Sequence, residues 1–276
     1  MKYFFMSVVW LLFSVNSFSS ILRSQIHSID LGQANERHLL MLTNGRTAFL
    51  DPKSKILLEA AQQSLQNGDT VEINLDSKLN LISIQTVAPE VQLEDEHLPF
   101  SEMMSYVPSI ISLATAQTVF QGMRRDYQNQ SQCYNRAHIW TYEAFKRNAL
   151  RSNKLFLFFT TRYIRKYNFY WWFHVTPMAY VGGTTQTFWR TLDRRYTSGP
   201  LSTKTWTDIF MRNNALCPVV YTYSRYRNHQ QEQDCYLIPT SMYFWQPYDI
   251  QRQESTGYVK TQFFSSQINA AYQEAF

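Results

Sequence analysis

The sequence is poor in glycine and proline and has no dense run of basic residues. Its 276 residues include 8 Gly and 9 Pro, while 45% are hydrophobic, which excludes collagen-like, low-complexity and intrinsically disordered chains. The formal net charge is only +5, and no cluster of five or more Lys or Arg occurs, so nucleic-acid binding is not indicated. Gly-rich phosphate loops and dinucleotide motifs are also absent, and no cofactor is expected.

Long apolar runs are absent except at the start of the chain. Lys2 gives a short positive region, Phe4 to Phe13 is almost wholly apolar, and Ser17-Phe18-Ser19 places small residues where a signal peptidase reads them. About ten apolar residues are too few to span a bilayer. We therefore predict a signal peptide over residues 1–19, a secreted or periplasmic protein, and no membrane contact after cleavage.

Cysteine is scarce, whereas aromatic residues are abundant. The 7 Trp, 18 Tyr and 19 Phe favour a strand-rich fold or an aromatic-lined groove. In an oxidising compartment two of the three cysteines are expected to pair. Cys217 and Cys235 flank a polar, Tyr-rich stretch (221–233) that is typical of a surface hairpin, and a disulfide there would contribute about 3 kcal/mol. Cys133 is then free, either as an inert buried thiol or as a reactive one.

The chain divides into an N-terminal unit, a linker and a larger domain. Residues 20–88 predict a small α+β unit, with strands at 23–30, 37–42, 47–50, 70–75 and 79–86 and a helix between Pro52 and Asn67. Residues 89–108 are acidic and irregular, which is typical of a linker. Residues 109–276 carry all the cysteines and are the predicted catalytic domain. The N-terminal unit fits either an inhibitory pro-region or a permanent accessory domain.

The segment from Ser131 to Lys146 contains neither Gly nor Pro and predicts a helix. With Ser131 as N-cap, Cys133 lies in the first turn, where free backbone N–H groups and the helix dipole favour a thiolate and could hold an oxyanion. His138 is five residues further, about 140° around the helix, and so faces away from Cys133. It is expected to make a structural hydrogen bond, and the base must come from elsewhere.

Three later segments (154–161, 171–181 and 186–193) are expected to be strands. If Gly183-Thr184 is the hairpin turn between the last two, His174 lies directly opposite Asp193. A carboxylate placed there orients the imidazole and stabilises its charged form. Pro177 restricts its strand to a sheet edge or a bulge, which would change the register. Structural alternatives are a buried His174 without chemistry and an Asp193 paired with a neighbouring arginine.

A nucleophile on a helix with a base and an acid on successive strands is the order of papain-like and transglutaminase-like folds. We therefore predict an α+β fold with a papain/transglutaminase-like core, in which the nucleophile helix packs on an antiparallel sheet, preceded by the small α+β unit. Trp171, Trp172 and Trp189 flank the predicted triad of Cys133, His174 and Asp193, and are candidates for the wall of a substrate slot or for the core. A metal site is not expected, because no Cys/His pair has ligand spacing.

The segment Cys133 to His138 resembles the Cys-aromatic-x-Arg-Ala-His motif of the secreted bacterial protein-glutaminases (protein-glutamine deamidases). His174-Val175 and Leu192-Asp193 are similar to that family's strand His-Val and aliphatic-Asp motifs, although Arg194 stands where members often have Pro. The stretch from Trp206 to Pro247 resembles a subgroup feature. The resemblance implies a transglutaminase-like core, often made with a pro-region.

The resemblance also implies hydrolytic deamidation of glutamine side chains in proteins or peptides, through a thioester on Cys133. The second oxyanion donor is open among Gln128, Gln130 and Gln132. Arg136 either helps to hold the active site or forms a structural ion pair, and we favour the ion pair. The alternatives are a transglutaminase or cysteine peptidase with the same triad, and a non-catalytic secreted binding domain.

Overall fold

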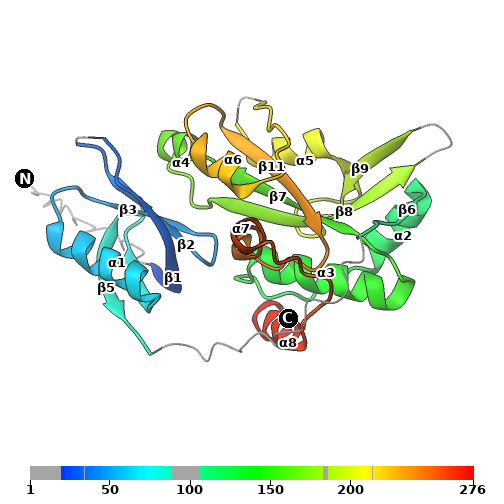
Figure 1. The fold of residues 1–276 in the computed structure, drawn as a ribbon, viewed down its shortest axis with the longest axis horizontal. Coiled ribbons are helices and arrows are strands. Elements are labelled where there is room, and N and C mark those ends of the chain that lie inside the picture. The colour runs from blue at the N-terminus through cyan, green and yellow to red at the C-terminus, as the bar shows by residue number, and fades with distance from the viewer. Residues whose placement is uncertain (1–19, 34, 89–105, 183–185, 213) are drawn as a thin grey trace, which may run out of the picture.

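A computed structural model of the chain describes residues 20–33, 35–88, 106–182, 186–212 and 214–276. These residues form two β-sheets, each with its own helices (Figure 1). We call residues 20–88 the N-terminal unit and residues 106–276 the C-terminal unit. The predicted signal peptide, most of the predicted linker and the predicted Gly183-Thr184 turn lie outside the described residues.

The N-terminal unit is an antiparallel five-stranded sheet with one helix. Its strand order is β3-β2-β1-β4-β5, and the long β1 pairs with β4 through its first half and with β2 through its second. Helix α1 covers one face and ends at Gly68, whose φ of +71° is the left-handed conformation that glycine adopts easily. The elements are β1 (Ser20–Asp30), β2 (His38–Leu42), β3 (Thr47–Leu50), α1 (Lys55–Asn67), β4 (Thr70–Leu75) and β5 (Leu81–Thr86).

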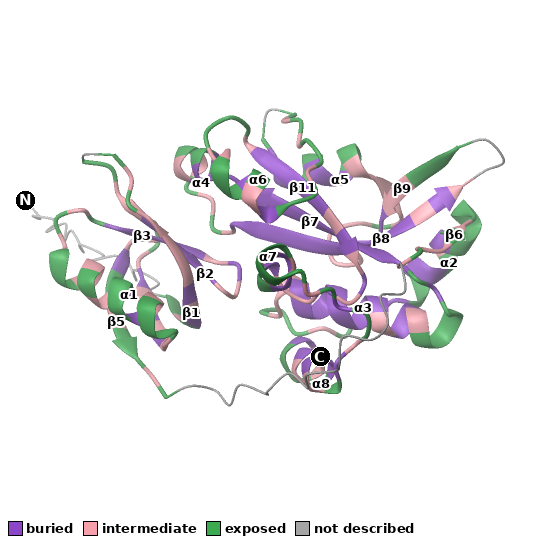
Figure 2. Cartoon of the chain, in the orientation of Figure 1, coloured by how far each residue is buried: buried purple, intermediate pink, exposed green. Residues whose placement is uncertain are grey.

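The sheet of the C-terminal unit has the order β10-β9-β8-β7-β11, and β6 pairs in parallel with the end of β8. Every residue of β7 is buried, and β8 beside it is almost as buried, so these two strands form the centre of the core (Figure 2). The strands are β6 (Ile110–Ile111), β7 (Asn153–Phe159), β8 (Phe173–Gly182), β9 (Thr187–Thr191), β10 (Leu201–Ser202) and β11 (Cys235–Ser241).

Helices lie on both sides of this sheet (Figure 1). Helix α3 runs along one face against β8 and packs on α8, while Trp206 and Phe210 of α5 pack on His174 on the other side. The helices are α2 (Leu113–Gly122), α3 (Cys133–Asn148), α4 (Thr161–Tyr167), α5 (Thr203–Phe210), α6 (Tyr223–Asn228), α7 (Pro247–Thr256) and α8 (Ser265–Ala275). The predicted α+β fold class, with the helix that begins at Cys133 packed on an antiparallel sheet, is confirmed.

Cysteine pairing is as predicted, but the structure between the two cysteines is not. Cys217 and Cys235 form a disulfide, and Cys133 is free. The stretch expected to be a surface hairpin contains α6, whose first turn is capped by the Thr222 hydroxyl, which accepts from the backbone N–H of Arg225 at 3.3 Å. The hairpin prediction is wrong because a Thr N-cap favours helix over strand.

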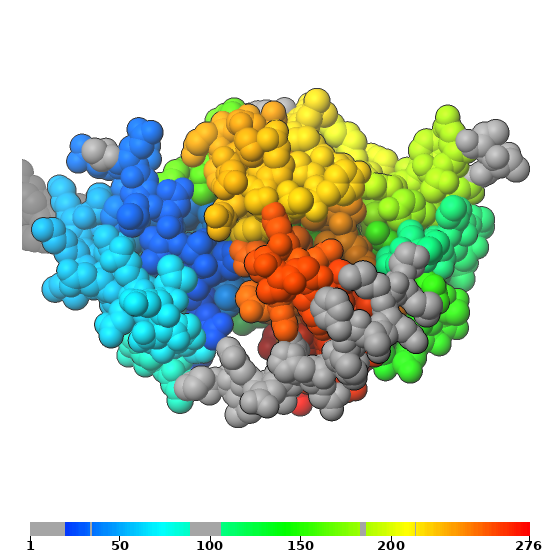
Figure 3. Space-filling model, viewed as in Figure 1, coloured from blue at the N-terminus to red at the C-terminus, as the bar shows by residue number. Residues whose placement is uncertain are grey.

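The two units lie against each other (Figure 3), and the turn between β2 and β3 is one of their points of contact. The backbone N–H of Thr47 donates to the Tyr170 carbonyl at 3.1 Å, and the Trp172 N–H donates to the Gly45 carbonyl at 3.0 Å. The indole of Trp172 also donates to the Leu42 carbonyl at 2.7 Å. The turn is therefore hydrogen-bonded to residues 170–172, just before β8, as one β-strand is to the next.

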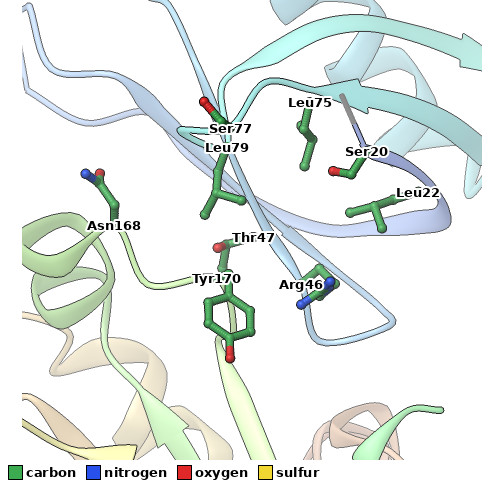
Figure 4. A pocket seen from close by; sticks show the side chains of 9 residues that line it. All are labelled: Ser20, Leu22, Arg46, Thr47, Leu75, Ser77, Leu79, Asn168 and Tyr170. Carbon is green, nitrogen blue, oxygen red and sulfur yellow. The ribbon is translucent and has the colours of Figure 1, made fainter. Parts of the chain in front are cut away.

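The contact between the units is not continuous. A pocket of about 390 Å³ lies between them, with Arg46, Thr47 and Leu79 on one side and Asn168 and Tyr170 on the other (Figure 4). Contacts on either side of this pocket hold the N-terminal unit in place: besides the turn, Arg165 of α4 forms an ion pair with Asp30 at 3.2 Å, and Phe49 is buried in the same cluster as Trp172 and Phe173.

Candidate active site

Cys133 is the first residue of α3 and is partly exposed. The N-cap is Gln132, in an extended conformation and without a side-chain capping bond, so the prediction of Ser131 as N-cap is wrong by one residue. The Ser131 hydroxyl instead donates to the Gln128 carbonyl at 2.6 Å. Since no side chain caps this end, the first-turn N–H groups stay available beside the sulfur. The predicted place of Cys133, in the first turn, is as expected.

His174 and Asp193 form a buried pair. His174 lies on β8 and Asp193 follows β9, and the distance from His174 Nε2 to Asp193 Oδ2 is 2.7 Å. Each residue is 1% exposed. The indole N–H of Trp206, on α5, donates to the same carboxylate oxygen at 2.9 Å. Two donors from different elements thus fix the carboxylate, and the carboxylate in turn fixes the imidazole.

The pair forms although the predicted strand register is wrong. That register placed Met178 opposite Trp189, whereas the structure pairs Met178 with Thr191, a shift of two residues. A shift by two keeps every side chain on its face of the sheet. The strand pairing ends at Pro177, whose carbonyl accepts from the Leu192 N–H at 2.8 Å, and the chain then bends to bring Asp193 to His174. Of the two predicted alternatives for Pro177, a sheet edge or a bulge, the sheet edge is wrong, because β8 lies between β9 and β7.

The electrostatics favour a charged imidazole. Burial lowers the pKa of His174, but the charge of Asp193, the hydrogen bond to it and the neighbouring Cys133 raise that pKa to about 9. Burial raises the pKa of Asp193, but the charge and hydrogen bond of His174, with the Trp206 bond and Arg136, lower it overall. Both shifts favour the ion pair over the neutral pair.

The second ring nitrogen of His174, Nδ1, makes no hydrogen bond to an oxygen or nitrogen atom of the described residues. Nδ1 is also buried. Cys133 nevertheless acts on the same ring, because the neighbouring sulfur and its charge raise the pKa of His174. The sulfur therefore lies close to the imidazole without a hydrogen bond of full geometry, which is common before substrate binds.

Aromatic rings surround the imidazole. Trp171 stacks on it at 5.7 Å between centroids, and Phe210 of α5 lies at 4.4 Å. Tyr196 meets its edge at 5.3 Å, and the Trp206 ring lies at 5.7 Å. These rings keep water from the His174–Asp193 pair, which strengthens the interaction between the two charges.

The three predicted tryptophans have different environments. Trp171 lies beside His174, where it can wall a substrate slot. Trp172 is fully buried and stacks on His27 of the N-terminal unit at 4.4 Å, so it belongs to the contact between units. Trp189 lies on β9 against Tyr180. Sequence reasoning missed the roles of Tyr196, Trp206 and Phe210, although the spacing of Trp206 and Phe210 places them on one helix face.

His138 has the structural role expected from its position on α3. Its Nδ1 lies 2.6 Å from Nζ of Lys154, which is fully buried on β7 and also donates to the Phe244 carbonyl. Burial, with the neighbouring positive charges of Lys154 and Lys260, lowers the pKa of His138. This pair ties α3 to the sheet. The described residues contain no cluster of His, Cys, Asp and Glu that could hold a metal ion.

Comparison with known proteins points to one family. Two crystal structures share the fold: a mutant of pro-protein-glutaminase, with a TM-score of 0.52 and 14% identity over 82% of this chain and 84% of that one, and pro-protein-glutaminase itself, with a TM-score of 0.50 and 13% identity over 91% and 90%. No curated protein matches. Residues 109–210 match the family described as glutaminase. The predicted resemblance to the protein-glutaminases is thereby confirmed, and the matched segment is the one that carries Cys133, His174 and Asp193. The match supports a hydrolase that acts on amide C–N bonds.

Proposed function

We propose that this protein deamidates glutamine side chains of proteins or peptides with Cys133 as nucleophile, His174 as general acid and base, and Asp193 as the acid that orients His174. The observation that carries the proposal is the buried His174–Asp193 pair, with its second imidazole nitrogen unbonded and Cys133 beside it at a helix N-terminus. The neighbours named protein-glutaminase favour glutamine within a protein as the substrate.

The reaction needs two proton transfers through one imidazole. The Cys133 thiolate attacks the carboxamide carbon, and the oxyanion is stabilised by the Cys133 backbone N–H and a second donor among Gln128, Gln130 and Gln132. The His174 imidazolium protonates the departing nitrogen, so that ammonia leaves and a thioester remains. Neutral His174 then takes a proton from water, which attacks the thioester and releases glutamate and the thiolate.

The experiment is ammonia release from casein, compared with free glutamine, by the unsubstituted chain and by Cys133→Ala. We expect the substitution to abolish release while the near-UV circular dichroism stays unchanged. Ammonia release that persists in C133A would refute the triad. Cleavage of the casein chain would instead indicate a peptidase, and incorporation of an added amine a transglutaminase. Resistance of Cys133 to iodoacetamide near neutral pH would favour a binding domain.

We also propose that the N-terminal unit is an inhibitory pro-region of the catalytic unit. Its β2–β3 turn pairs with residues 170–172, next to His174, and Arg46 forms a β-bridge with Trp171, whose ring stacks on the imidazole. A protein substrate that approaches this edge meets the turn first. Limited proteolysis within residues 89–108 should therefore raise the rate of ammonia release, and an unchanged rate would favour an accessory domain.

Export through a signal peptide over residues 1–19, to the medium or the periplasm, remains part of the proposal. The disulfide between Cys217 and Cys235 supports an oxidising compartment. Among the described residues, no helix has the length and apolar character needed to cross a membrane. N-terminal sequencing of the exported protein tests the cleavage site.

A further inference from the structure

Arg136 is a buried cation to which the mechanism above gives no role. It lies on α3, three residues after Cys133, and is 2% exposed. Residues three apart on a helix share a face, and long side chains on helices point back toward the N-terminus. The guanidinium follows this rule: its Nη1 donates to the Ser131 carbonyl and, at 2.9 Å, to the Ser131 hydroxyl. The cation thus spans the turn that leads into Cys133.

Arg136 does not form the structural ion pair that the sequence favoured. In the described part of the chain, both of its hydrogen bonds go to Ser131, and its buried Nε has no partner. A buried guanidinium without a counter-ion is costly. The charged and titratable groups that face it are Cys133, Asp193, Arg195 and Tyr196, and the ring of Tyr127 lies 5.7 Å from its central carbon.

Of these groups, only two can be anions at neutral pH. Asp193 already accepts from His174 and Trp206, and its charge is balanced by the imidazolium. Arg195 is a second cation and makes the need for an anion greater. Burial lowers the pKa of Arg136, and Cys133 is the strongest of the charges that oppose this effect. Cys133 lies three residues before Arg136 on α3, at the end of the turn that the guanidinium spans, and therefore remains as the counter-ion.

We propose that Arg136 is a positioning residue that clamps the Ser131–Cys133 turn and holds the Cys133 sulfur as a thiolate. This rests on the proposed role of Cys133 as nucleophile. With this assignment each buried negative charge has a positive partner: the Asp193 carboxylate pairs with the His174 imidazolium, and the Cys133 thiolate pairs with the Arg136 guanidinium. The thiolate then interacts with two cations, and the proton that His174 carries stays available for the leaving ammonia.

The test is the pH midpoint of thiolate absorbance at 240 nm. Cys133 is the sole free cysteine of the chain, and subtraction of the matching Cys133→Ser spectrum removes the tyrosine signal. A cation one helical turn (about 5.4 Å) from the sulfur is expected to lower the midpoint by about two pH units at an effective dielectric constant of about 20. We expect Arg136→Gln to raise the midpoint by at least about one unit and Arg136→Lys to leave it within about half a unit.

Arg194→Gln is the matched control, because Arg194 is a partly buried arginine that stacks over Phe120 at 4.6 Å. We expect R194Q to leave the midpoint unchanged. An unshifted midpoint in R136Q, or equal shifts in R136Q and R194Q, would overturn the proposal. If R136Q does not fold, R136K decides: because lysine keeps the positive charge, a midpoint that stays within about half a unit supports the proposal, and a midpoint that rises by about one unit or more would overturn it.

Failure of this proposal is distinguishable from failure of the proposed function. If C133A abolishes ammonia release but R136Q leaves the thiolate midpoint unchanged, the nucleophile stands and the role of Arg136 is refuted. If C133A retains ammonia release, the proposed function itself fails, whatever the midpoint of R136Q.

Discussion

Protonation of His27 is expected to loosen the contact between the two units. His27 lies on β1 and its ring is enclosed by the C-terminal unit: it stacks on Trp172 at 4.4 Å, and its Nε2 lies 2.9 Å from the Tyr223 hydroxyl and 3.2 Å from Nε2 of Gln251. The Gln251 amide nitrogen can only donate, so Nε2 must accept and the imidazole must be neutral. Burial lowers the pKa of His27 to about 4.

The lowered pKa of His27 determines how docking depends on pH. An undocked His27 is expected near 6.5, so docking has its full strength above pH 6.5 and weakens as the pH falls toward 4. A difference of about 2.5 units corresponds to about 3 kcal/mol below pH 4, and part of it is offset by a cation–π interaction of about 1 kcal/mol with Trp172. If the cation–π interaction is left out, the equilibrium constant for docking should be about twentyfold smaller at pH 5 than at pH 7.

The assay is hydrogen exchange of the intact chain, corrected for the intrinsic effect of pH. The amides of Thr47 and Trp172 report docking directly, because each donates across the contact. We expect His27→Gln, which stays neutral, to lose most of the change in protection between pH 7 and pH 5. His38→Gln is the matched control, since His38 contacts the Leu31 carbonyl within its own unit. An undiminished pH effect in H27Q would refute the reasoning.

Three further predictions concern single contacts. Trp206→Phe keeps the ring but removes the bond to Asp193, and should lower kcat for ammonia release at least about tenfold, whereas Trp189→Phe should not. Gly45→Val places a side chain where φ is +86° and a Cβ would lie 3.1 Å from the Phe173 ring, so ammonia release by the uncleaved chain should rise if the turn inhibits. Replacing Cys217 and Cys235 by Ala should lower the free energy of unfolding by about 3 kcal/mol, measured by calorimetry, without loss of activity in the folded fraction.

The sequence predicted those features that local physics determines. The alternation of β4 and the helical spacing of α1 are visible within a few residues, and the observed β4 has the predicted bounds. The position of Cys133 in a first turn follows from a long segment without Gly or Pro. By contrast, the β8–β9 register, in which Gly182 pairs with Thr187 and Met178 with Thr191, could not be derived from the local sequence pattern.

Contacts between distant residues could not be read from the sequence. The sequence leaves Trp172 open between a substrate slot and the core, whereas its indole N–H donates to the Leu42 carbonyl, 130 residues earlier in the chain. His27 carried no signal at all, because its environment comes from α6, α7 and the start of β8. Arg136 stood within a recognisable motif, yet its partner could be identified only once the carboxylates around it were placed.

The geometry also limits how the N-terminal unit can act. His174, Asp193 and Trp206 hold their hydrogen bonds while the β2–β3 turn is docked beside them, and their partners all come from the C-terminal unit. Inhibition by this unit must therefore work by blocking access to a site that is already assembled, not by pulling the site apart. Removal of the unit should then raise kcat/KM for protein substrates strongly while the thiolate midpoint of Cys133 stays where it was. A midpoint that moves on cleavage would mean that docking also alters the charges at the sulfur.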